Sequence, residues 1–178
     1  DPPDAIKLEG EGKNAVIMEA GKKLDVSTPI TLTIPLPDGF VSNTTDKVFV
    51  QHKGYEYNTT VTSDGDDGFI ATFTNPHGFS TFTISTKSQT VATVNGDNYT
   101  SFQDAVDAVS NNGTITIPSG ASVPEGGLSA TISGADSKSV KVENKTNASI
   151  TVTINGEAKT IGNGSTADFT YTYTPSQG

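Results

Sequence analysis

The sequence predicts a mainly β protein: a small β-sandwich followed by a small α+β domain with one short helix. Runs of alternating apolar and polar residues recur about every ten residues, as the strands of small sandwiches do. Turn-forming pairs such as Asn95-Gly96 and Asn155-Gly156 separate several of these runs. An apolar spacing typical of a helix is found at about residues 101–111, so we expect a helix there.

In the first half, residues 1–14 are polar, and we expect them to be only loosely tied down. The clearest strand alternates apolar residues with threonine from Ile30 to Leu36. Pro35 places this strand at a sheet edge or at a strand end, because proline cannot donate to the hydrogen-bond ladder. Further strands are expected at about 15–18, 48–50, 55–57, 61, 69–74 and 79–85.

The second half opens with the segment TVATVNGDNYTSFQDAVDAVSNNGTITIP, residues 90–118, which reads as strand, tight turn, helix and strand. Ser101 is in the position of a helix N-cap, and Asn112-Gly113 predicts a left-handed helix end. Later strands are expected near 129–132, 140–142, 150–154, 158–161 and 169–174. The polar junction at residues 87–89 predicts two domains, 1–87 and 88–178, on a short linker.

Composition limits the partners that the chain can have. The formal net charge is −9, and all 11 basic residues are lysine. Without arginine the chain lacks the planar group that reads guanines and phosphates, so we expect no nucleic-acid partner. No apolar run has the length of a membrane span, so no membrane insertion is expected. The absence of cysteine excludes disulfides and thiolate sites.

An acidic turn is the best metal candidate in the sequence. Asp64, Asp66 and Asp67 lie on a glycine-containing loop, and carboxylates on such a loop suit Ca²⁺. The run lacks a bidentate glutamate at the proper distance, and Asp-Gly pairs are also ordinary hairpin turns. A plain turn is the favoured interpretation and calcium the alternative; no other cofactor is expected.

Two tyrosine pairs could form a stacking platform for sugars. Tyr171 and Tyr173 fall on one face of the last expected strand, and Tyr55 and Tyr57 are spaced in the same way. Aromatic pairs on one strand face usually serve packing instead, and the chain has no tryptophan. Packing is therefore the favoured interpretation, with a glycan site at Tyr171 and Tyr173 as the alternative.

A catalytic centre is not expected. His52 and His77 are the only histidines, and their spacing is not that of a metal or catalytic motif. Nothing in the sequence places Ser63 or Ser80 against either of them as a nucleophile.

Two stretches carry a resemblance to known modules. The segment VATVNGDNYTSFQDAVDAVSNNGTITI resembles one that opens a β-rich module, often the first coil of a β-helix, in secreted and wall-attached proteins of Gram-positive gut bacteria. The stretches TLTIPLPDGF, KVFVQHKGYEYNTTVTS and GFIATFTNPHGFSTFTIS resemble a spacer module of such surface proteins.

The resemblance implies a non-catalytic structural or adhesive segment of a large extracellular cell-surface protein. Its partners would be other domains of the same long chain, and host or dietary glycans or host surface proteins. The alternative is an accessory or carbohydrate-binding segment of a secreted polysaccharide-degrading enzyme.

Overall fold

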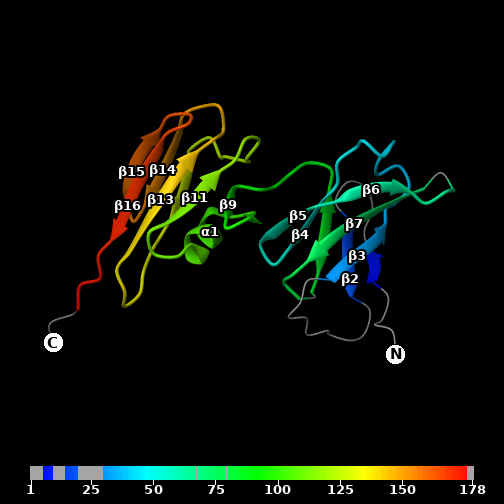
Figure 1. The fold of residues 1–178 in the computed structure, drawn as a ribbon, viewed down its shortest axis with the longest axis horizontal. Coiled ribbons are helices and arrows are strands. Elements are labelled where there is room, and N and C mark those ends of the chain that lie inside the picture. Colours follow the sequence, from blue (N-terminus) through cyan, green and yellow to red (C-terminus); the bar gives the residue numbers. More distant parts are fainter. Residues whose placement is uncertain (1–5, 10–14, 20–29, 67, 79, 176–178) are drawn as a thin grey trace. The chain divides into compact units, whose positions relative to one another are not determined.

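A computed structural model describes residues 6–9, 15–19, 30–66, 68–78 and 80–175 (Figure 1). The chain divides into two compact units, Asp1–Ser88 and Gln89–Gly178, and the boundary expected after Lys87 lies next to this division. The predicted mainly β class is confirmed, since strands make up both units and the described residues form one short helix. No helix among the described residues has the length and apolarity needed to cross a membrane.

The first unit holds two antiparallel sheets. One has the strand order β1-β2-β8-β4-β5 and the other the order β3-β7-β6. The strands of the first sheet are β1 (Ile6–Glu9), β2 (Ala15–Glu19), β8 (Phe82–Ser85), β4 (Phe49–His52) and β5 (Tyr55–Asn58). Those of the second are β3 (Ile30–Pro35), β7 (Phe69–Asn75) and β6 (Thr60–Ser63).

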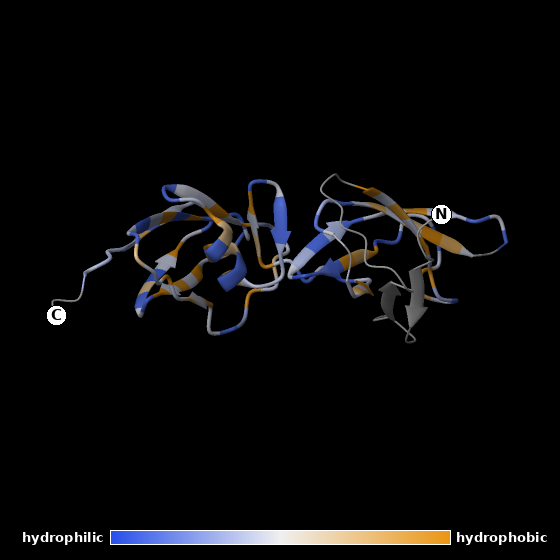
Figure 2. Ribbon diagram, turned by 90° about the horizontal axis from the view of Figure 1, so that it is seen from below, coloured by the Kyte–Doolittle hydropathy of each residue, from blue (hydrophilic) through white to orange (hydrophobic). Residues whose placement is uncertain are grey.

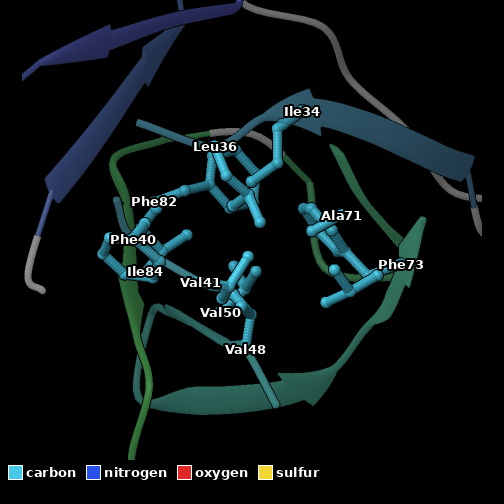
Figure 3. Close-up of a cluster of buried hydrophobic side chains, with 11 residues drawn as sticks. Ile34, Leu36, Phe40, Val41, Val48, Val50, Ala71, Phe73, Phe82 and Ile84 are labelled. Carbon is cyan, nitrogen blue, oxygen red and sulfur yellow. The ribbon is translucent and has the colours of Figure 1, made fainter. Parts of the chain in front are cut away.

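Side chains from both sheets fill one core in the first unit (Figure 3). Alternation along each strand sends every second residue inward, as Val50 of β4, Ile84 of β8 and Ala71 of β7 show. Figure 2 shows the same pattern, with hydrophobic stretches within strands and hydrophilic ones at many turns. The buried cluster consists of Ile34, Leu36, Phe40, Val41, Val48, Val50, Val61, Ala71, Phe73, Phe82 and Ile84.

Pro35 behaves as the sequence predicts, because it ends β3, an edge strand that pairs with β7. The expectation of a loosely tied opening is wrong for Ile6–Glu9, which pair with β2 as strand β1. The sequence does carry a signal for this strand, because Ile6 and Leu8 alternate with charged residues. The last strand of this unit begins at Phe82 rather than at residue 79, and Phe79 lies outside the described residues.

The second unit also holds two sheets, with the strand orders β10-β9-β11-β13-β16 and β12-β14-β15. The first contains β10 (Asp97–Tyr99), β9 (Ala92–Val94), β11 (Gly113–Ile117), β13 (Lys138–Asn144) and β16 (Thr166–Tyr171). The second contains β12 (Leu128–Ala130), β14 (Ile150–Ile154) and β15 (Glu157–Ile161). Both predicted Asn-Gly hairpins form, with positive φ at Asn95, Gly96, Asn155 and Gly156.

The chain winds through the second unit as a coil. It passes from β11 to β12 in the other sheet, returns as β13 parallel to β11, and crosses again as β14 parallel to β12. The winding then stops, because β15 and β16 run antiparallel to β14 and β13. Residues facing the inside of this coil are buried; they include Ile115, Ile117, Val142, Val152 and Phe169.

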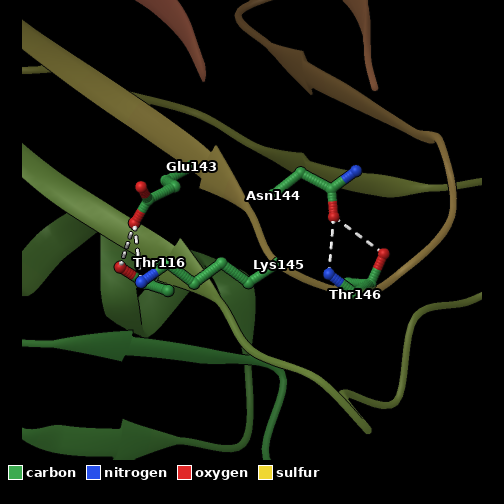
Figure 4. Close-up of polar contacts among 5 residues, drawn as sticks. All are labelled: Thr116, Glu143, Asn144, Lys145 and Thr146. Atoms are coloured by element: carbon green, nitrogen blue, oxygen red, sulfur yellow. Dashed lines mark hydrogen bonds and ion pairs between the residues drawn. The ribbon is translucent and has the colours of Figure 1, made fainter. Parts of the chain in front are cut away.

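A polar anchor closes the coil at the end of β13 (Figure 4). The Asn144 side chain is fully buried, and its Nδ2 donates to the carbonyls of Ala148 at 2.7 Å and Ile161 at 2.8 Å. Its Oδ1 accepts from the backbone N–H of Thr146 at 2.9 Å and from the Thr146 hydroxyl at 2.7 Å. One amide therefore joins β13, the loop after it and the end of β15.

The single described helix, α1 (Phe102–Ala108), packs against β9, β10 and β12. Ser101 caps it as predicted, since its hydroxyl accepts from the Asp104 N–H at 3.0 Å. The apolar face that the sequence indicates is buried, including Phe102, Val106 and the C-cap Val109.

The predicted helix range of about 101–111 is too long, because Val109 takes an extended conformation and ends the helix. The following asparagines serve other contacts. Asn111 Oδ1 accepts from the Ser139 N–H at 2.8 Å. Asn112 has its left-handed φ of 65° in the turn closed by Gly113 N–H on the Ser110 carbonyl. The left-handed residue therefore starts β11 rather than capping the helix.

The last strand is also displaced from its expected range. It spans Thr166–Tyr171 instead of 169–174, because its ladder with β13 ends where Tyr171 pairs with Lys138, the first residue of β13. The sequence pattern continues beyond the point at which a partner strand exists.

Candidate functional site

A cluster of polar and aromatic groups surrounds His52, at the end of β4. Its ring is 2% exposed and stacks on Phe82 with 4.3 Å between ring centroids. Nε2 lies 3.0 Å from the Gly78 carbonyl oxygen, and Nδ1 lies 3.1 Å from the Ser80 hydroxyl. With the proton on Nε2, Nε2–H donates to the Gly78 carbonyl, and Nδ1, which also lies 3.3 Å from the Thr81 carbonyl oxygen, accepts from the Ser80 hydroxyl.

A second histidine sits beside two tyrosines of β5. The His77 ring stacks on Tyr55 with 3.5 Å between centroids and an interplanar angle of 2°. Its Nδ1 lies 2.6 Å from the Tyr57 hydroxyl. Its backbone N–H donates to Asn75 Oδ1 at 3.0 Å, and its carbonyl accepts from the Lys53 ammonium at 3.3 Å. The stack holds the turn after β7 against β5, so Tyr55 and Tyr57 serve packing within the unit.

The expectation that neither serine meets a histidine is wrong for Ser80. The ladder between β4 and β8 causes the encounter: it pairs Gln51 with Thr83, which brings Ser80, just before β8, beside His52 at the end of β4. The sequence carries no local signal for this contact, because it depends on the pairing of two strands that are distant in the chain. The resulting hydroxyl–imidazole contact is the first element of a nucleophile–base pair. Here it also fastens the segment that leads into β8.

The environment of His52 makes the first unit sensitive to acid. Burial is the main cause that lowers the pKa of His52, and the nearby Lys53 adds to it, against backbone carbonyls that favour the protonated ring. A base with a depressed pKa in the folded state binds protons more weakly than the unfolded chain does. Its contribution to stability is therefore complete above the unfolded pKa of about 6.5 and declines as the pH falls toward the folded value.

We expect the free energy of unfolding of the first unit to fall between pH 7.5 and pH 5.5, and His52→Gln to reduce that slope. Denaturant titrations at several pH values, monitored through NMR signals of the first unit, measure this pH dependence of its free energy of unfolding. His77→Gln is the matched control, since it also removes a histidine but leaves His52 in place. If both variants reduced the slope of unfolding free energy against pH equally, the pH dependence would come from the loss of any histidine charge and not from the burial of His52.

The acidic turn predicted as a calcium candidate lies between β6 and β7. Asp64 Oδ1 accepts from the Asp66 N–H at 3.1 Å, and the Asp64 N–H donates to the Gly68 carbonyl at 3.2 Å. These contacts are those of a hairpin turn. Asp67 lies outside the described residues. Among the residues that the structure does describe, no three histidine or acidic side chains are grouped to hold a metal, and calcium binding stays a prediction.

The tyrosines proposed for glycan stacking lie at the end of β16. The Tyr171 hydroxyl donates to the Gly134 carbonyl at 2.8 Å, and Tyr171 shares its strand face with buried Phe169. Tyr173 follows the strand, is 39% exposed, and donates its backbone N–H to the Ser137 hydroxyl at 2.9 Å. Tyr171 therefore has a packing role, and a glycan site at this pair stays a prediction.

Comparisons with protein-family models, with curated proteins and with solved structures found no match to this chain.

Proposed function

We propose that this chain is a non-catalytic segment of a larger bacterial cell-surface protein, with a role in spacing, presentation or adhesion outside the cell. Two small β units with buried cores suit this role, because packed sheets resist deformation. The acidic net charge of −9 would keep an exposed surface segment soluble. Under this proposal the Ser80–His52 contact has a structural purpose, namely to hold the chain between β7 and β8.

The observation that best supports the proposal is the anchoring of the chain on both sides of the unit boundary. On one side, the Ser88 hydroxyl donates to Oε1 of the buried Glu56. On the other side, the Thr90 carbonyl accepts from the Ser122 N–H at 3.0 Å, and the Val91 N–H donates to the Tyr99 carbonyl at 2.8 Å. Because these anchors are close together in the sequence, very few residues between the two units are free to act as a linker. A short linker limits independent movement of the two units, which a spacer must avoid.

A pair of spin labels tests this directly. The chain has no cysteine, so Thr62→Cys on β6 and Thr160→Cys on β15 give two specific labelling sites, both at exposed positions. We expect a narrow distance distribution between the labels in the otherwise natural chain. A flexible Gly-Ser insert between Ser88 and Gln89 should broaden it.

The insert variant is the control for the width that a free linker produces. If the natural chain gave a distribution as broad as that of the insert variant, the units would move independently and the spacing role would be wrong. Labels at Thr62→Cys and Thr31→Cys, both exposed and both in the first unit, would report the width due to the labels themselves.

A further inference from the structure

A shallow groove of about 370 Å³ lies on the outer face of the second unit. It spans β13 and β16 and reaches the turn before β11, and it is lined by Asn112, Ser139, Val140, Lys141, Asp168 and Thr170. Its volume is within the range of small-ligand sites. We propose that this groove binds a neutral saccharide.

The strand register brings the polar lining together. Ser139 pairs with Thr170 and Lys141 pairs with Asp168 across the antiparallel ladder. Directly opposed residues of a ladder share one face of the sheet, and the alternate residues face the core. The Ser139 and Thr170 hydroxyls lie 3.1 Å apart, and both residues line the groove.

The other polar groups of the groove are free to meet a ligand. Opposed charges on neighbouring strands ordinarily pair, yet the Lys141 ammonium and the Asp168 carboxylate form no ion pair with each other in the described part of the chain. Asn112 donates its backbone N–H to the Ser139 carbonyl at 2.7 Å, which fixes the residue at the rim while its side-chain amide is exposed.

Glu143, on the same strand as Lys141, shows the contrast. Its carboxylate lies 3.6 Å from the Lys145 ammonium and accepts from the Thr116 hydroxyl at 3.4 Å (Figure 4). Glu143 and Lys145 are thus paired with each other, whereas Lys141 and Asp168, which oppose each other in the groove, are not.

The chemistry of these groups favours hydroxyl-rich ligands without net charge. Asp168 can accept from two neighbouring hydroxyls, the Lys141 ammonium can donate to hydroxyl or ring oxygens, and the Asn112 amide can do either. One positive and one negative side chain give the lining no net charge, so it does not select an ion. The net charge of −9 on the whole chain disfavours anionic sugars further. A neutral saccharide satisfies all of these conditions.

This inference goes beyond the proposed spacing role and does not depend on it. The test is an NMR titration of the full chain with maltotetraose, xylotetraose and cellotetraose at millimolar concentration, with glycylglycine as a zwitterionic comparison. We expect at least one saccharide to shift the backbone amide signals of Asn112, Lys141 and Asp168. Asp168→Ala and Lys141→Ala should each weaken that saccharide's binding about tenfold, the loss that follows from removing one charged hydrogen-bonding group.

Lys145→Ala is the matched control, because it removes a lysine near the end of the same strand that points to Glu143 instead of the groove. It should leave the affinity unchanged. The proposal is overturned if none of the saccharides shifts these signals, if shifts occur only around Tyr55 or Tyr173, or if glycylglycine binds as well as the saccharides do. The spin-label distances are read independently, so failure of either proposal can be told from failure of the other.

Discussion

Replacing Gly127 with alanine is expected to lower the free energy of unfolding of the second unit by on the order of 3–5 kcal/mol. Gly127 precedes β12 and has a φ of 92°, which L-residues rarely adopt. A Cβ built on it would lie 2.3 Å from the Thr151 carbonyl oxygen of β14, far inside van der Waals contact. Because the obstacle is the backbone of the neighbouring strand, relief requires moving β12 away from its parallel partner β14.

Alanine substitutions at two other glycines separate the cost of the clash with Thr151 from the cost of the positive φ. Gly126→Ala meets open space and no positive φ, so it should change stability by less than about 0.5 kcal/mol. Gly120→Ala also meets open space but has a φ of 80°, so it should cost about 1 kcal/mol from backbone conformation alone. Guanidinium titrations followed by NMR signals of Val140 and Val152 report the second unit separately. A Gly127→Ala cost no larger than that of Gly120→Ala would show that β12 does not pack on β14 as described.

Local signals in the sequence were sufficient for the hairpins and for the helix start. A two-residue hairpin turn of this type needs positive φ at both of its residues, and Asn and Gly are the residues that tolerate it, so the signal lies in two adjacent residues; both predicted hairpins form. The Ser101 cap likewise depends only on the residues that follow it. The mainly β class needs only alternation along each strand, because each strand buries one face.

The coil of the second unit could not be predicted in this way. Which strand lies beside which depends on partners distant in sequence, as the parallel pairing of β11 with β13 shows. The turn residues Asn111 and Asn112 read equally well as a helix end until their contact with Ser139 is known. The same limit applied to His52 and Ser80, which are 28 positions apart and meet only because both flank β-sheet partners.

The groove on β13 and β16 was missed for a related reason. Its residues are common polar types in a threonine-rich chain, so nothing in the sequence marks them. The aromatic pattern predicted a possible glycan site at Tyr171 instead. Strand alternation puts Tyr171 on the opposite face from Asp168 and Thr170. Only the register between the two strands assembles the groove.

Asn144→Asp is expected to lower the free energy of unfolding of the second unit by on the order of 3–5 kcal/mol at pH 7. The substitution keeps the shape of the side chain but removes the two protons that Nδ2 donates to the Ala148 and Ile161 carbonyls. An ionised carboxylate would then face two carbonyl oxygens at a site with 0% exposure. The two Thr146 donors to Oδ1 remain, but the lost Nδ2 hydrogen bonds and the buried charge facing two carbonyls both act to destabilise the fold.

The pH dependence identifies this cause. Burial against two acceptors must raise the pKa of an aspartate at this position, so the unfolded chain of the variant releases its proton more readily than the folded one. The deficit relative to the natural protein should therefore shrink as the pH falls from 7 toward about 4, and it levels off below the unfolded pKa of about 3.9, where the introduced acid is protonated in both states. A cavity or a packing defect would give a deficit that does not change with pH.

Asn163→Asp is the matched control for this variant. Asn163 is exposed, and its Oδ1 accepts from the Asn147 N–H at 3.0 Å, a role that a carboxylate also fills. It should alter stability by less than about 0.5 kcal/mol at pH 7. Denaturant titrations of both variants across this pH range decide the matter, because equal costs at positions 144 and 163 would mean that the buried amide does not join β13 to β15.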